Sequence, residues 1–329
     1  MPSFRLQFRL QFRLLLAALA CGLPLAAPHA QPFPNKPIRF IVPVPPGGGA
    51  DFVARNYATY LSKALGQQFV IDNRGGAGGS VGTELVARAA PDGYTLAMVS
   101  GSHSINPSLY KSLPYDTLRD FATVTQVVLS PGILVVAASM PVRNLREFIE
   151  LARSRRGEWS YASAGFGTPP HLAMELLKNI TGIRLTHVPY KGSAAMVPDL
   201  VGGQIAATIP SIPSVLPLVK AGRLTALAVT SRTRTAAAPE VPTMIEAGVP
   251  DYEASSWYGL LAPAATPRAI VERLHRETAQ ILRNDEIRAR LIEQGLDPVG
   301  NTPREFAGVI STEIVKWRGV VKAAGTPIE

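Results

Sequence analysis

One local pattern occurs three times in this chain: an apolar, strand-like run, then a glycine-rich turn, then a helix-like segment. The turns lie at residues 45–51, 75–80 and 163–168. The first amides of a helix have no partner inside the helix, and the helix dipole favours negative charge there. Glycine allows an anion to approach those amides closely. The turns therefore predict a cradle for a small anion, without deciding whether the anion is carried or transformed.

Strand-like and helix-like segments alternate along most of the chain. Strands are predicted at 38–44, 69–72, 95–100, 121–138, 159–163, 184–189, 205–209, 224–230 and 256–262. Helices are predicted at 51–65, 80–89, 144–155, 169–180, 193–201, 213–220, 267–283, 285–294 and 303–322. This alternation is typical of an α/β fold with mostly parallel sheets.

The predicted organisation is two domains around a cleft. Domain I takes residues 31–122 and 253–329, and domain II takes residues 123–252. The three C-terminal helices have no accompanying strands, so they are expected to return and cover domain I. The chain would then cross between the domains twice, near 121–138 and near 230–258. Two crossings beside a cleft would act as hinges.

Residues 1–30 have the pattern of a secretory signal peptide. A positive start is followed by an apolar run at 14–25 and by small residues up to Ala30. The segment is too short and wrongly flanked for a membrane anchor. Cleavage is expected after Ala30, with Ala27 as the alternative, which places the mature protein in the periplasm.

Cys21 is the only cysteine in the chain, and it lies inside the predicted signal peptide. Its removal would leave a secreted chain that is stabilised by its core without a disulfide. Residues 18–21 loosely resemble a lipobox, so lipid attachment at Cys21 is the alternative.

The charge of the chain is modest and dispersed. The formal net charge is +9, and three of the positive charges belong to Arg5, Arg9 and Arg13 of the predicted signal. The remaining Lys and Arg are scattered, which favours solvated helix ends over a nucleic-acid surface. The histidines show no metal-ligand spacing, and no strand precedes an intact G-x-G-x-x-G. We therefore expect no nucleic acid, no metal and no cofactor.

Residues 78–82 match the G-x-S-x-G nucleophile pattern of α/β-hydrolases, with Ser80 at its centre. That nucleophile needs a turn that leaves a strand directly, with a histidine and an acid nearby. Here the preceding strand is predicted to end at Asp72, and His171 and His187 lie in the other half. A serine hydrolase is therefore the enzyme alternative, and no enzyme activity is expected.

Short motifs in a fixed order extend over nearly the whole mature chain. They are PNKPI at 34–38, IVP at 41–43, PPGG at 45–48, DNR at 72–74, PDGYTL at 91–96, PHL at 170–172, HVPYKG at 187–192, LAVT at 227–230 and YGL at 258–260. Each motif is weak alone, but the ordered set is specific. In this set the chain resembles the TctC or Bug family, the extracytoplasmic solute receptors of tripartite tricarboxylate transporters.

The resemblance implies a two-domain periplasmic binding protein of the Venus-flytrap type. Such a receptor captures a small carboxylate by domain closure and delivers it to the large and small membrane subunits of its transporter. We expect it to be a monomer. A periplasmic sensor that partners a signalling protein would use the same cleft, so it remains the alternative.

The resemblance also implies which residues hold the ligand. Family members bind the carboxylate mainly with backbone amides, hydroxyls and ordered water from the glycine-rich loops. Carried over by position, the candidates are Gly47, Gly48, Asp51, Gly76, Ala77, Gly78, Ser163, Gly165, Gly167 and Thr168. Asp51 also lies where an N-cap of the following helix is expected, so the sequence leaves two roles for it: contact with the ligand, or capping of the helix alone.

The chain departs from the family in two segments where an acidic residue is common. Residues 203–207 and 209–211 contain no Asp or Glu. A ligand ammonium group would have fewer partners without these acids. The resemblance therefore favours a plain carboxylate over an acidic amino acid.

Overall fold

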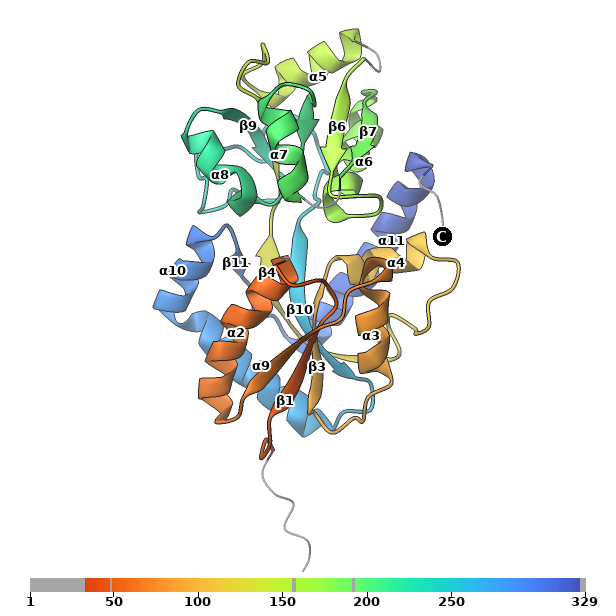
Figure 1. Ribbon diagram of the computed structural model, residues 1–329, viewed down its shortest axis with the longest axis vertical. Coiled ribbons are helices and arrows are strands. Elements are labelled where there is room, and N and C mark those ends of the chain that lie inside the picture. Colours follow the sequence, from red (N-terminus) through yellow and green to blue (C-terminus); the bar gives the residue numbers. More distant parts are fainter. Residues whose placement is uncertain (1–32, 48, 156–157, 191–192, 326–329) are drawn as a thin grey trace, which may run out of the picture. The chain divides into compact units, whose positions relative to one another are not determined.

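Two β-sheets organise the described part of the chain (Figure 1). The computed structural model describes residues 33–47, 49–155, 158–190 and 193–325. The predicted signal peptide, its two cleavage sites, Cys21 and Gly48 lie outside these residues. Both sheets belong to one unit of the chain, Lys36–Glu329.

The first sheet has six strands in the order β11-β4-β10-β3-β1-β2. The strands are β1 (Ile38–Val42), β2 (Phe69–Asn73), β3 (Thr95–Ser100), β4 (Phe121–Ser130), β10 (Ser256–Pro263) and β11 (Asp297–Pro298). The accompanying helices are α2 (Gly49–Leu65), α3 (Ser80–Ala87), α4 (Ser102–Leu109), α9 (Arg268–Arg283), α10 (Asp285–Glu293) and α11 (Pro303–Ala324), with a 3₁₀ turn, η1 (Ala77–Gly79), before α3.

The second sheet has five strands in the order β7-β6-β8-β5-β9. The strands are β5 (Ile133–Ala137), β6 (Ser160–Ser163), β7 (Thr186–Pro189), β8 (Ala207–Thr208) and β9 (Leu224–Val229). Its helices are α5 (Leu145–Ser154), α6 (Pro169–Thr181), α7 (Ser193–Val201) and α8 (Ile212–Lys220). The α/β class predicted from the alternating segments is therefore confirmed.

Both sheets are mixed, which corrects the expectation of mostly parallel sheets. In the first sheet β1 pairs in parallel with β2 and β3, whereas β10 is antiparallel to β3 and β4. In the second, β6 is parallel to β7 and β8, whereas β5 is antiparallel to β8 and β9. The parallel pairs come from strand–helix–strand units. The antiparallel strands β4, β5 and β10 flank the places where the chain passes between sheets without a helical crossover.

The chain passes between the sheets at two points. Only Pro131 and Gly132 separate β4 of the first sheet from β5 of the second, and the return runs from β9 to β10. The predicted domain limits remain a prediction. Most of β4, residues 123–130, lies in the segment predicted as domain II although β4 belongs to the first sheet, and the other strands of each sheet come from the corresponding segments.

Helix α11 contributes to the cores beside both sheets. It begins with a capping box formed by Thr302 and Glu305, which satisfies two backbone amides that would otherwise lack partners. Its first half places Phe306 in the core with Trp257 of β10. Its second half places Trp317 in the core that contains Leu172 of α6. The C-terminal helices therefore return as expected, but α11 also extends to the second sheet.

Helix α4 and strand β11 were not predicted. The α4 sequence contains poor helix formers and an internal proline, Pro107. The helix forms because His103 and Ile105 become buried, and tertiary packing of this kind overrides local propensity. Within the described ranges, none of the helices combines the length and apolarity needed to cross a membrane.

Candidate ligand-binding site

A cavity of about 310 Å³, here called the central cavity, is lined by the starts of four helices. Gly49 and Ala50 begin α2, Ser102 begins α4, Thr168 precedes α6, and Ser211 precedes α8. Two of these helices belong with the first sheet and two with the second. Because each helix start carries partial positive charge, their convergence favours an anion in the cavity.

The helix starts do not contribute equally. Pro169 is the first residue of α6, Pro170 the second, and Pro213 the second residue of α8. Proline has no N–H, so these two helices offer fewer amide donors while keeping their dipoles. Backbone donors to a ligand are therefore expected mainly from α2 and α4.

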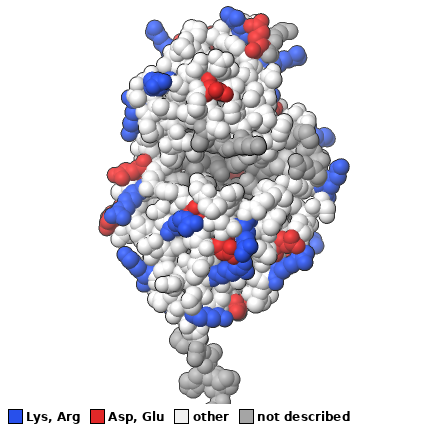
Figure 2. Space-filling model, viewed as in Figure 1, with Lys and Arg blue, Asp and Glu red and all other residues white. Residues whose placement is uncertain are grey.

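Hydroxyl groups supply much of the polar lining. Those of the central cavity belong to Ser100, Ser102, Ser130, Thr168, Ser211, Ser256 and Tyr258. None of the described lining residues carries a charged side chain. On the face shown in Figure 2, charged side chains are scattered among uncharged ones. A carboxylate here would be held by dipoles and neutral donors, without an ion pair.

Tyr258 and Gly49 form a tight pair at the wall of the cavity. Tyr258 reaches the cavity from β10, and a Cβ atom on Gly49 would overlap its hydroxyl. Burial raises the pKa of Tyr258 to about 12, although a hydrogen bond with Ser130 by itself lowers the pKa. The phenol is therefore neutral at physiological pH and can donate a hydrogen bond.

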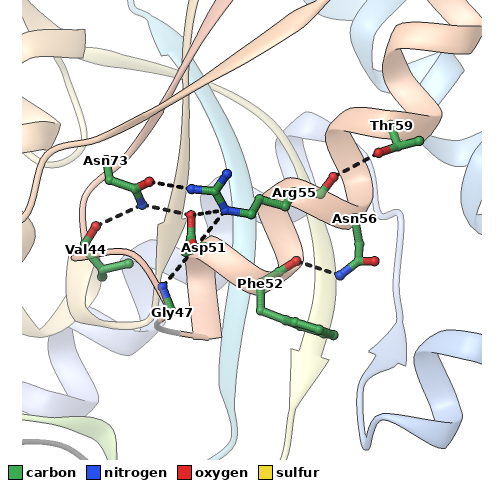
Figure 3. Close-up of polar contacts among 8 residues, drawn as sticks. All are labelled: Val44, Gly47, Asp51, Phe52, Arg55, Asn56, Thr59 and Asn73. Carbon is green, nitrogen blue, oxygen red and sulfur yellow. Dashed lines mark hydrogen bonds and ion pairs between the residues drawn. The ribbon is translucent and has the colours of Figure 1, made fainter.

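Asp51 lies in the first turn of α2, because the helix starts at Gly49 (Figure 3). This corrects the prediction that it is the N-cap. Its Oδ2 accepts from the Gly47 N–H at 2.9 Å, and its Oδ1 accepts from Asn73 Nδ2 at 2.9 Å. Arg55 Nε lies 2.9 Å from Oδ1. Asp51 thereby ties the first turn to α2 and β2.

The partners of Asp51 set its charge state. Burial alone would raise its pKa, but the bonds from Arg55, Gly47 and Asn73 together lower it below the ordinary value. The buried carboxylate is therefore charged and already saturated with donors. It is not among the described residues that line the central cavity.

The second glycine-rich turn lines a neighbouring cavity of about 260 Å³, here called the glycine-loop cavity. Gly76, Ala77 and Gly78 form part of its wall, and Thr168 lines both this cavity and the central one. The structure thus brings these four predicted residues together. Gly78 has a φ of +63°, which is strained for other residues, and its carbonyl accepts from Asn106 Nδ2 at 3.1 Å.

The third turn uses its polar groups internally. The Gly165 N–H donates to Ser163 Oγ at 3.1 Å, and the Gly167 N–H donates to His171 Nδ1 at 3.1 Å. Ser163 Oγ also lies 2.6 Å from His187 Nε2. Ser163, Gly165 and Gly167 are not among the described residues that line either cavity, and the exposed Gly47 is not among them either.

The histidines behind the third turn are held neutral. The rings of His171 and His187 stack at 4.2 Å between centroids. Burial, with the nearby His187 and Lys178, lowers the pKa of His171 to about 3. A neutral ring keeps Nδ1 available as an acceptor for the Gly167 amide.

Several lining residues are outside the ten candidates carried over by position, although Gly49 and Ala50 belong to the first predicted turn. They are Gly49, Ala50, Ser100, Ser102, Ser130, Ser211, Ser256 and Tyr258. The signal for Ser211 was present, since a serine followed closely by Pro213 is typical of a helix start. Ser130, Ser256 and Tyr258 lie on the strands where the chain changes sheet, and no local pattern distinguishes them.

The surroundings of Ser80 differ from those of a hydrolase nucleophile. β2 ends at Asn73, and Ser80 is reached only after η1, as the first residue of α3. His171 and His187 stack on Tyr161 of β6 instead. The strand-to-nucleophile turn that the hydrolase alternative requires is therefore replaced by a longer loop.

Comparison with known proteins gives consistent matches. Residues 53–326 match the model of the tripartite tricarboxylate transporter family receptor, TctC. Protein BugT of Bordetella pertussis is 39% identical over 302 residues, which cover 91% of this chain and 93% of BugT.

Two solved structures with bound carboxylates are similar in sequence and fold. R. palustris Rpa4515 with adipate is 38% identical with a TM-score of 0.80, covering 90% of this chain and 99% of that one. MatC from Rhodopseudomonas palustris with bound malate is 32% identical with a TM-score of 0.76, covering 88% and 100%. The fold is that of Venus-flytrap periplasmic binding proteins, and these relatives are solute-binding receptors.

Proposed function

This chain belongs to the tripartite tricarboxylate transporter receptor family, TctC, and we propose that it captures a small carboxylate and delivers it to the membrane subunits of such a transporter. The observation that carries the proposal is the central cavity itself. Four helix starts and a set of hydroxyls converge there without a charged side chain among the described lining residues. This is an environment for an anion that must be held and later released.

The proposed mechanism is capture by domain closure. The two sheets would act as two domains, with the strand connections near 121–138 and 230–258 as hinges. The anion would first bond to the starts of α2 and α4, and the starts of α6 and α8 would then close over it. A ligand drives such a change only if it binds the closed form more tightly.

The chemistry of the lining favours a plain carboxylate as the ligand. The similar structures hold adipate and malate. Ile209, Pro210 and Ser211 line the central cavity, so the segment without acids is part of the site. An amino-acid ligand would bury its ammonium group without a carboxylate partner, which is unfavourable.

The proposed ligand contacts start from the residues predicted earlier. Gly76, Ala77, Gly78 and Thr168 would face the ligand. Gly47, Gly48, Asp51, Ser163, Gly165 and Gly167 complete the proposed set, and for Asp51 and Ser163 the internal hydrogen bonds support a role in shaping the loops. The mature protein is proposed to be a periplasmic monomer that is exported by a cleaved signal peptide.

Calorimetric titration of refolded mature protein with small mono-, di- and tricarboxylates tests the proposal. We expect at least one carboxylate to bind, and Ser102→Ala and Thr168→Ala to weaken it. If no carboxylate binds while the protein is folded by circular dichroism, the proposed function is wrong. Deletion of the coding gene should abolish uptake of the bound carboxylate; normal uptake would favour the sensor alternative.

A further inference from the structure

A second cavity of about 290 Å³, here called the side cavity, adjoins the central cavity. The two share Gly49, Ser130, Ser211 and Tyr258 as lining residues. None of these four residues lines the glycine-loop cavity. The residues that the glycine-loop cavity has in common with the central cavity are Val44, Ala50, Ser100, Ser102 and Thr168. The central cavity therefore has two different extensions, each with its own walls.

The walls of the side cavity are mostly apolar. Phe52 and Val53 of α2 face Pro213 of α8 and Leu296, which follows α10. Phe52 keeps 44% of its surface exposed, although it is a large apolar side chain. Among the described lining residues that belong only to this cavity, Ser214 and Gln294 are polar and none is charged.

The glycine-loop cavity offers more polar surface than the side cavity. Its wall contains the backbone of Gly76, Ala77 and Gly78 and the amide side chain of Asn106. Peptide and amide groups can satisfy a carboxylate, whereas the part of the side cavity lined by Phe52, Pro213 and Leu296 offers it no hydrogen-bond donor from a side chain. A ligand that occupied both extensions would therefore lie with its charged end toward the glycine loop and its apolar end toward Phe52.

We infer that the side cavity receives an apolar arm of the bound ligand, so that the preferred ligand is a monocarboxylate with an alkyl or aryl group. This inference rests on the proposed function, because it assumes a carboxylate in the central cavity. Tyr258 and Gly49 stand where the two cavities meet, and Phe52 and Leu296 determine which arm fits. A dicarboxylate would have to place its second charge against these apolar walls or leave the side cavity unused.

Carboxylates that differ in chain length or in their terminal group test the inference. Acetate, butyrate, hexanoate and adipate are titrated by calorimetry into the same refolded protein. Affinity should rise by about fourfold for each methylene that enters the side cavity. Hexanoate should bind more tightly than adipate, since the two share a six-carbon chain and differ only at the terminal group.

Two variants test whether the preference for hexanoate arises in the side cavity. Phe52→Ala should reduce the gain from butyrate to hexanoate, because one wall of the side cavity is lost. Gln294→Lys places a cation in the side cavity and should reverse the preference, so that adipate binds more tightly than hexanoate. Gln68→Lys is the matched control, since Gln68 is exposed and precedes β2 at the end of the strand away from the glycine-rich turn. It should retain the hexanoate preference.

The possible outcomes distinguish an error in the side-cavity inference from an error in the proposed function. Equal or tighter binding of adipate by the parent protein, or an affinity that does not change with chain length, would overturn the inference and leave the proposed function intact. An unchanged preference in folded Gln294→Lys would also overturn it. Absence of binding by every carboxylate would overturn the proposed function itself.

Discussion

Gly49 and Tyr258 show how one missing side chain shapes the site. Gly49 needs no unusual backbone angle; it is constrained because a Cβ atom would occupy the position of the Tyr258 hydroxyl. The three consecutive glycines at 47–49 marked the turn in the sequence, but the partner of Gly49 lies more than 200 positions away. Proximity of this kind arises only when β10 enters the first sheet.

The Gly49→Ala variant should lose ligand affinity by about tenfold or more, equivalent to about 1.4 kcal/mol, because the displaced Tyr258 lines the central cavity. Calorimetry on the parent, Gly49→Ala, Tyr258→Phe and the double variant forms a mutant cycle. The two changes should be strongly non-additive, since removal of the hydroxyl makes room for the methyl group. Gly308→Ala, in an open part of α11, is the control and should bind normally. Additive effects would contradict the steric account.

His171 should make stability depend on pH. Its pKa is about 3 in the folded protein, against an ordinary value of 6.5. Between these values the unfolded chain binds a proton that the folded protein does not, so the free energy of unfolding falls as the pH falls below about 6.5. The contribution of His171 is at most about 1.4 kcal/mol per pH unit.

Urea unfolding from pH 8 to pH 5 tests this dependence with His171→Gln. Glutamine retains an acceptor for the Gly167 amide but does not titrate. Between pH 6.5 and 5 the variant should lose stability less steeply than the parent, whereas the two slopes should agree near pH 8. Parallel curves over the whole range would show that His171 titrates normally in the folded protein.

At the scale of elements, the first turn is held to its sheet by Asp51. One carboxylate joins the Gly47 amide, Asn73 of β2 and Arg55 of α2 (Figure 3). Asp51 is only 3% exposed, so the donors around it would be left unsatisfied if it were removed. This arrangement explains an acidic residue beside a predicted anion site: the charge is used within the loop.

Asp51→Ala should lower the free energy of unfolding by about 3 kcal/mol, since charge-assisted hydrogen bonds in a buried place are lost. Asp285→Ala is the matched control, because Asp285 is an exposed acid in the first turn of α10. It should cost about 0.5 kcal/mol. Urea unfolding measures both. Unchanged stability with a large loss of affinity would instead indicate that Asp51 contacts the ligand.

Elements with strong local signals were predictable, and the others were not. Amphipathic α2 and α11 and the apolar strands follow from their side-chain spacing. Helix α4 depends on the burial of His103 and Ile105, and β11 depends on pairing with β4. Of the candidate site, the second glycine-rich turn and Thr168 were identified. The hydroxyls of β4 and β10 were not, because no local pattern marks a residue at the junction of two sheets.

At the scale of the whole molecule, α11 links the two cores. Phe306 packs with Trp257 beside the first sheet, and Trp317 packs in the core of the second. Trp257 Nε1 also donates to Glu313 Oε2 at 2.6 Å, which joins α11 to the strand that returns from the second sheet. Domain closure would therefore have to accommodate α11 as well as the two strand connections.

Trp317→Ala should lower the free energy of unfolding by about 3 to 5 kcal/mol and should separate the unfolding of the two sheets. The parent should unfold in one calorimetric transition, because the core that contains Trp317 combines residues of the second sheet with residues of α4 and α11. Trp159→Ala is the control, since Trp159 packs against Phe148 within the second sheet's core. It should lower the melting temperature without splitting the transition. A single transition in Trp317→Ala would show that α11 does not couple the two cores.

The α/β class, the glycine-rich turns and the family follow from the order of the amino acids alone, because each depends on local spacing or on motifs in linear order. Folding sets which helix starts converge, which turn amides are bonded within the protein and where the side cavity lies. These features escape local patterns because a cavity is bounded by residues that are distant in the chain. Whether a turn offers its amides to a ligand depends on the acceptors that folding brings to it, as Asp51 and His171 show.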